Sequence, residues 1–257
     1  MFESLITSYI FLSIFAFIAG FIDAIVGGGG LIQLPSLLIQ FPQTPIATLF
    51  GTNKIAAFSG TITSAWHYSK RIKFNFSLLL FIGLFAGIFS FFGAKMVSFV
   101  NVDWFKPLIL FVLIAILIYT ITKKDLGKIN THKVSIKKQF IYGGILASLL
   151  GFYDGFFGPG TGSFFVLGFV VLLGFDFLQA SAYAKVVNSI TNISALFVFL
   201  YQGNFMFGIA LIMAISNIMG NIIGTRMAFK RGNSFIRIIF ILVVSLLIIR
   251  YAYDIYK

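Results

Sequence analysis

Four charged side chains stand inside long apolar runs of this sequence and are its strongest candidates for chemistry: Asp23, Lys54, Asp154 and Lys185. A charge inside hydrocarbon is costly unless it is paired or bound. A buried ammonium group suits an anion, so we expect both lysines to contact a substrate, with an ion pair to Asp23 or Asp154 as the structural alternative. The aspartates suit proton coupling or gating, and capping of nearby backbone amides is their structural alternative.

Glycine clusters follow both aspartates after a few residues. Each glycine costs a helix about 1 kcal/mol relative to alanine, so both clusters predict helix breaks, and the freed amides require protein or water partners. Amides at the start of the following helix favour an anion, whereas close helix packing through small residues is the structural alternative. The cluster residues assigned to a substrate site are Gly27, Gly28, Gly29 and Gly30, then Gly158, Gly160, Thr161 and Gly162.

Hydroxyl and amide side chains accompany the two lysines. Thr52 and Asn53 precede Lys54, and Asn188 follows Lys185 by three residues. We assign these three to the substrate site because they add hydrogen-bond donors beside the ammonium groups. The other polar neighbours are expected to make hydrogen bonds between helices; they are Ser59, Thr61, Ser189, Thr191 and Asn192.

The composition excludes a soluble fold. Of 257 residues, 59% are hydrophobic and 10% are charged, whereas a soluble domain carries about 25% charged residues. Apolar runs of about 20 residues, the length that crosses a ~30 Å hydrocarbon core, recur along the whole chain. The sequence therefore predicts an all-α polytopic membrane protein surrounded by the lipid bilayer.

Several partners and cofactors are excluded by the rarer residues. The chain has no cysteine, and its two histidines, His67 and His132, are far apart in sequence. We therefore expect no disulfide, no metal site and no cofactor. The net charge of +12 comes largely from basic residues in short loops, which the positive-inside rule explains. No nucleic-acid partner is expected.

Ten apolar segments divide into two sets of five. The predicted organisation is a first repeat over residues 1–122, a basic linker over 123–138 and a second repeat over 139–257. The first set covers about residues 4–26, 31–41, 45–68, 75–97 and 103–122, and the second about 139–157, 162–174, 177–201, 205–229 and 234–255.

The two sets match when 131 is added to a position in the first. Asp23 then corresponds to Asp154, and Lys54 to Lys185. Such a match among apolar residues would be unremarkable in this chain, but only seven of its residues are acidic. The sequence therefore predicts an internal repeat, with a short glycine-broken helix in each half.

Loop charges predict that the two repeats have inverted topology. The loop over residues 70–73 is basic, whereas its counterpart over 201–204 carries no charge, and the bias reverses at the next loop, where residues 230–237 are basic. Under the positive-inside rule the linker over 123–138 is then cytoplasmic and both termini lie outside. The first two segments of each repeat either cross twice or form a re-entrant hairpin.

Four sequence elements resemble the sulfite exporter TauE/SafE family, and the resemblance covers nearly the whole chain. It implies movement of small anions, typically sulfur-containing ones such as sulfite or sulfonates, outward from the cytoplasm. Pro159 and Thr161 interrupt the second glycine cluster, so the two half-sites need not be equivalent. The elements are GFIDAIVGGGGLIQLPSLL (20–38), ATLFGTNKIAA (47–57), GFYDGFFGPGTGSF (151–164) and AKVVNSITN (184–192).

We expect a secondary transporter of the cytoplasmic membrane that moves a small anion by alternating access between its repeats, with a proton as coupling ion. An anion channel is the alternative, because the same residues can line a pore. An intramembrane aspartyl protease requires Gly-x-Gly-Asp, whereas Gly20-Phe21-Ile22 precedes Asp23, so we expect no enzyme. The sequence leaves the oligomeric state open, a homo-oligomer included.

Overall fold

The structure is a computed structural model that describes residues 2–97, 114, 117–118 and 134–256. Within these residues every regular element is an α-helix, so the all-α fold class is confirmed. The fifth predicted segment of the first half, residues 103–122, lies almost entirely outside the described residues, and so do residues 123–133 of the predicted linker.

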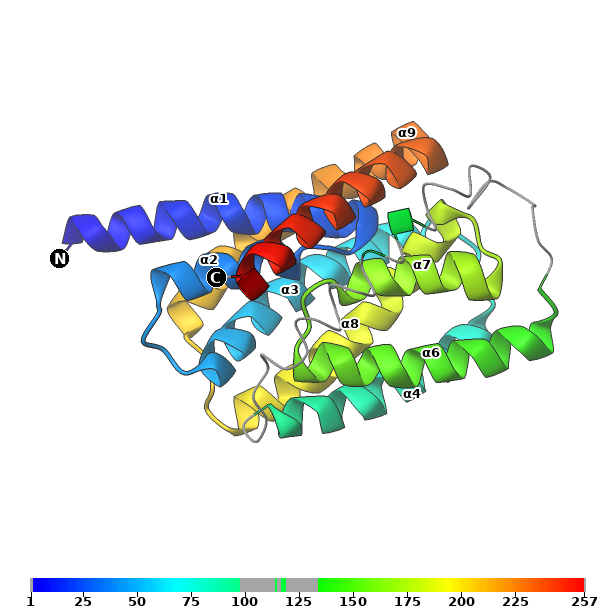
Figure 1. Ribbon diagram of the computed structural model, residues 1–257, viewed down its shortest axis with the longest axis horizontal. Coiled ribbons are helices and arrows are strands. Elements are labelled where there is room, and N and C mark those ends of the chain that lie inside the picture. Colours follow the sequence, from blue (N-terminus) through cyan, green and yellow to red (C-terminus); the bar gives the residue numbers. More distant parts are fainter. Residues whose placement is uncertain (1, 98–113, 115–116, 119–133, 257) are drawn as a thin grey trace.

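The described helices follow the predicted apolar segments to within a few residues. They are α1 (Phe2–Val26), α2 (Gly30–Gln40), α3 (Ile46–Ser69), α4 (Phe76–Met96), α6 (Ile136–Phe156), α7 (Thr161–Leu173), α8 (Phe177–Tyr201) and α9 (Phe207–Tyr256). Helix α9 contains the last two predicted segments. Its backbone leaves helical geometry at Gly232 (φ 70°, ψ −163°), where the chain turns back on itself (Figure 1).

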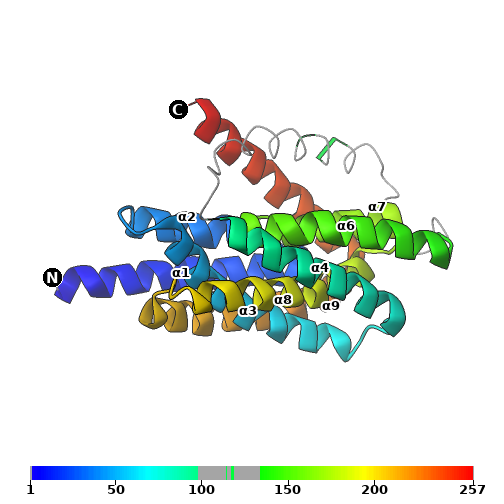
Figure 2. The ribbon, with the colours of Figure 1, turned by 90° about the horizontal axis from the view of Figure 1, so that it is seen from below.

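Four stretches within the described helices are long and apolar enough to cross a membrane: Thr7–Val26, Phe76–Met96, Phe177–Tyr201 and Phe207–Leu246. Helices α2 and α7 are much shorter, with 11 and 13 residues. At 1.5 Å per residue they extend only about 17 and 20 Å, less than a ~30 Å hydrocarbon core. They lie toward opposite ends of the molecule (Figures 1 and 2).

The first helix of each half packs against the other half, α1 on α9 and α6 on α4. A Cβ added at Gly20 of α1 would lie 2.2 Å from the backbone oxygen of Asn217, and one at Gly151 of α6 would lie 2.4 Å from that of Ala86. Only glycine fits such separations, so the helices approach backbone to backbone, as small residues permit in membranes. The halves are therefore interlocked.

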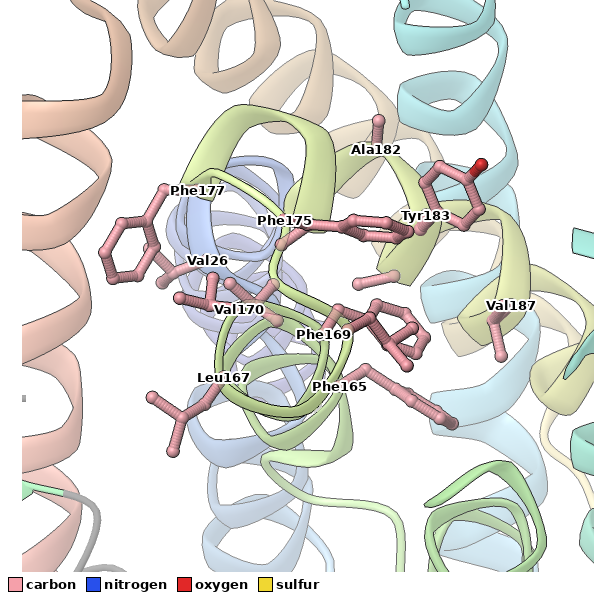
Figure 3. Close-up of a cluster of buried hydrophobic side chains, with 14 of the residues drawn as sticks. Val26, Phe165, Leu167, Phe169, Val170, Phe175, Phe177, Ala182, Tyr183 and Val187 are labelled. Carbon is pink, nitrogen blue, oxygen red and sulfur yellow. The ribbon is translucent and has the colours of Figure 1, made fainter. Parts of the chain in front are cut away.

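Aromatic rings surround α7 and hold it against α8 (Figure 3). The ring centroid of Tyr183 lies 6.3 Å from that of Phe169 and 4.7 Å from that of Phe175. The Tyr183 hydroxyl accepts a hydrogen bond from the backbone N–H of Asn75, just before α4 (2.7 Å). Because lipid tails are as apolar as these rings, burial from lipid does not stabilise the cluster. Close packing of the rings does, at about 0.5–1.5 kcal/mol per aromatic pair. This cluster positions α7 and the break before it.

The close packing of α6 on α4 predicts a sharp cost for a side chain at Gly151. Gly151→Val should lower the apparent melting temperature in detergent by several degrees, because overpacking costs about 1–3 kcal/mol. Gly208→Val is the matched control, since a Cβ at Gly208 would meet nothing within 4 Å. Equal melting temperatures for the two variants would contradict the backbone contact.

Candidate functional site

A small polar cavity lies where the two glycine breaks meet. Its volume is about 30 Å³, room for about two water molecules. A polyatomic anion therefore requires this conformation to widen. The cavity is lined from both halves, by Asp23, Gly27, Gly29, Gly30, Gln33, Asn53, Lys54, Ala57, Thr61, Asp154, Gly158, Gly160, Gly162, Asn188, Asn192 and Asn217.

Gly27 and Gly162 bring the two breaks into direct contact. Gly27 has a left-handed backbone (φ 82°), and its backbone oxygen accepts a hydrogen bond from the N–H of Ser163 at 3.0 Å. A Cβ on Gly27 would lie 2.3 Å from the backbone carbon of Gly162. The two breaks thus pack closely against each other, which was the alternative to a role in anion binding. Gly27 and Gly162 also line the cavity.

Helices α2 and α7 both begin at the cavity. Gly30 is the first residue of α2 and Gly160 is the N-cap of α7, and both line the cavity. Several N–H groups of the first turns already donate to backbone oxygens, among them Leu31 to Gly28 (3.2 Å) and Ser163 to Gly27 (3.0 Å). The partial positive charge of the two helix N-termini still favours an anion here. Two cluster residues assigned to the site are not among the lining residues. Gly28 lies against Val243, and the Thr161 hydroxyl donates to the backbone oxygen of Gly158 at 2.7 Å.

Two buried ion pairs cross between the halves. The Nζ of Lys54 lies 2.7 Å from Oδ2 of Asp154, and the Nζ of Lys185 lies 3.2 Å from Oδ2 of Asp23. All four residues are at most 7% exposed. Lys54 also donates to Oδ1 of Asn192 at 3.0 Å, and Lys185 donates to the backbone oxygen of Asp23. Each pair takes its lysine from one half and its aspartate from the other.

These pairs match the structural alternative for the lysines, and contact with a substrate stays a prediction. Lys54 lines the cavity, whereas Lys185 is fully buried behind it. Two cationic and two anionic side chains sum to zero charge, so the helix N-termini give the cavity a positive balance. Among the described residues, no group of three or more His, Asp or Glu is placed to hold a metal ion.

The polar neighbours of the lysines divide between the cavity and the helix contacts. Asn53 and Asn188, both assigned to the substrate site, line the cavity. Thr52 does not, because its hydroxyl donates to the backbone oxygen of Thr48 (2.7 Å) and accepts from the backbone N–H of Met206 (2.9 Å). Thr52 of α3 therefore holds the segment just before α9 against α3.

Thr61 and Asn192, expected only in interhelical hydrogen bonds, both line the cavity and contact a charged group there. The Thr61 hydroxyl donates to the backbone oxygen of Ala57 at 2.6 Å and lies 3.4 Å from Oδ2 of Asp23, and Asn192 accepts from Lys54. Their interhelical contacts are thus part of the site itself.

Besides Thr61 and Asn192, sequence reasoning missed three lining residues: Gln33, Ala57 and Asn217. The offset of 131 does not reveal the two amides, because Gln33 corresponds to Phe164 and Asn217 to Ala86. An amide side chain within an apolar run is the signal that would have found both.

A larger groove lies on the outer surface between α4 and α8. Its volume is about 600 Å³, and its lining includes Leu80, Leu84 and Ile190 but no charged residue. Leu80 and Leu84 are 63% and 58% exposed, as expected for side chains that face lipid. The small polar cavity is therefore the candidate functional site.

Apolar helices around a buried ionic site define the class of polytopic membrane proteins that includes transporters. Residues 12–251 match the family described as sulfite exporter TauE/SafE. The chain belongs to this family and is a membrane transporter.

Three relatives cover nearly the whole chain. The probable membrane transporter protein ORF9 of Sinorhizobium is 39% identical over 95% of this chain and 92% of its own length. A probable membrane transporter protein of Haemophilus influenzae is 33% identical over 93% and 92%, and YfcA of Escherichia coli K12, named in the same way, is 32% identical over 93% and 87%. No solved structure matches the chain.

The ion pairs predict that replacing one member of a pair destabilises the protein more than replacing both members. Lys54→Met leaves Asp154 buried and uncompensated, at a cost of about 3–5 kcal/mol, whereas an apolar replacement of a whole buried pair is often neutral. The double variant Lys54→Met/Asp154→Leu should therefore have a higher apparent melting temperature in detergent than Lys54→Met. Lys95→Met, at an exposed position of α4, serves as the control and should resemble the wild type. A double variant less stable than the single one would contradict the pairing.

Proposed function

We propose that this protein exports a small sulfur-containing anion, such as sulfite or an organosulfonate, across the cytoplasmic membrane, and that it catalyses no reaction. The observation that carries the proposal is the crossing of two buried lysine–aspartate pairs at a cavity where two helices begin. Ammonium groups and helix N-termini together favour an anion. Membership of the TauE/SafE family supports the sulfur-containing class.

Helix directions support alternating access between inverted halves. Helix α4 runs parallel to α8, because Asn75 contacts Tyr183 near the start of both and Gly87 contacts Ser194 further along. The chain reverses between α3 and α4 (Figure 2). Consequently α3 and α8, the third helices of the two halves, run in opposite directions, the arrangement of secondary transporters whose site lies between inverted repeats.

The ion pairs offer a way to couple the anion to protons. An anion gains the ammonium group of Lys54 only when its pair with Asp154 opens. A protonated Asp154 has no charge with which to hold Lys54, so proton uptake releases a cation that already lines the cavity. Asp23 also lines the cavity, but its partner Lys185 does not, so protonation of Asp23 releases a cation that is not at the cavity surface. The proton is therefore the coupling ion of the proposal.

The small size of the cavity is compatible with a carrier. A space of about 30 Å³ has to widen before an anion can pass, and widening requires the helices to move. An anion channel remains the alternative, which flux measurements separate, because a carrier saturates at modest rates.

Reconstituted protein tests the transport proposal. Wild-type proteoliposomes should take up sulfite or methanesulfonate with saturable kinetics, and Lys95→Met should behave alike. Lys54→Met/Asp154→Leu leaves no unpaired charge and should be folded but inactive, with less than about a tenth of wild-type uptake. Normal uptake by this double variant would remove Lys54 from the site, and flux without saturation would favour a channel.

Cysteine labelling tests the inverted topology with both termini outside and the linker in the cytoplasm. The chain has no cysteine of its own, and Ser69 and Gln202 are both exposed. In intact cells a membrane-impermeant maleimide should label Gln202→Cys and reach Ser69→Cys only after the membrane is opened, because the basic loop after Ser69 is placed inside. Labelling of both positions from one side would contradict inversion.

A further inference from the structure

Three amide side chains form a hydrogen-bonded ladder that leads into the cavity wall. Gln33 of α2, Asn217 and Asn221 of α9 are at most 2% exposed. Asn217 Nδ2 donates to Gln33 Oε1 at 2.6 Å, and Asn221 Nδ2 donates to Asn217 Oδ1 at 2.7 Å. At the far end Ser64 donates to Asn221 Oδ1.

The direction of this ladder is fixed by a backbone group. Asn221 Nδ2 also bonds the backbone oxygen of Asn217 at 3.0 Å, and a carbonyl only accepts, so this end of Asn221 must be the NH₂ group. Oδ1 of Asn217 is then the acceptor and its Nδ2 the donor, which makes the bonded atom of Gln33 the oxygen. The remaining end of Gln33, its NH₂ group, is a buried donor that has no hydrogen-bond partner among the described residues.

The ladder exists in one half-site only. Adding or subtracting 131 relates Gln33 to Phe164, Asn217 to Ala86 and Asn221 to Ser90. Of these counterparts only Ser90 is polar, and its hydroxyl donates to the backbone oxygen of Thr191 at 2.8 Å, outside the cavity lining. Gln33 lines the cavity from α2, and the ladder that orients its NH₂ group has no counterpart at the related positions of the other half.

We propose that the Gln33 NH₂ group donates a hydrogen bond to an oxygen of the bound anion and so selects a polyatomic oxyanion held in one orientation. This rests on the proposed function. An oxyanion presents several acceptor oxygens, so one can accept from Gln33 while another faces Lys54, which lines the same cavity. A halide has a single centre and gains less from two separated donors. An unpaired buried donor also disfavours ligands that cannot accept its bond.

Binding of sulfite and chloride to purified protein tests the role of Gln33. Gln33→Met keeps the length of the side chain and removes the donor, so sulfite affinity should fall about tenfold or more, while chloride affinity changes little. Gln33→Glu keeps the shape and places a carboxylate there, and should lower sulfite affinity further. Wild-type sulfite affinity in Gln33→Met, or an equal loss for both anions, would overturn the inference while the proposed function stands.

A matched pair of variants tests the ladder as a positioning device. Asn221→Ala removes the group that fixes Asn217 and should lower the ratio of sulfite to chloride affinity, whereas Ser90→Ala, at the related position, should leave that ratio unchanged. An equal ratio in both variants would overturn the positioning role. Failure of the wild type to bind sulfite, thiosulfate or methanesulfonate would instead overturn the proposed function, and the inference with it.

Discussion

The crossed lysine–aspartate pairs are the constraint on which the rest of the structure depends. A charge in the middle of an apolar bundle requires a partner, and here every partner comes from the opposite half. Side chains of the two halves can form ion pairs with one another only if the backbones of the halves approach closely. The glycine contacts of α1 with α9 and of α6 with α4 provide that approach, and the breaks before α2 and α7 give the charged groups a polar surrounding.

The positions of the helices were predictable because they follow from local properties of the chain. An apolar run sets the length of a helix, and consecutive glycines end it wherever they occur. The choice of ion-pair partner was not predictable in this way. The offset of 131 allows Lys54 to pair with Asp23 or with Asp154, and only the tertiary packing decides between them. The structure selects Asp154.

The repeat indicated only part of the cavity lining. Asp23, Asp154 and Lys54 line the cavity, whereas Lys185, the counterpart of Lys54, does not. Asn53 and Asn188 line it although their counterparts are Ala184 and Ala57. Gln33 and Asn217 belong to one half only, and a comparison of halves cannot detect them. Thr52, assigned to the substrate site, is not among the lining residues. Its hydroxyl bonds the backbone groups of Thr48 and Met206, a use that the sequence does not distinguish from ligand binding.

The contact between Gly27 and Gly162 has a mechanical consequence. With the backbones this close, neither break can shift toward the other, and the hydrogen bond from Ser163 to Gly27 resists their separation. Separating the beginnings of α2 and α7 therefore has to break this hydrogen bond, so the two half-sites open against a shared backbone contact.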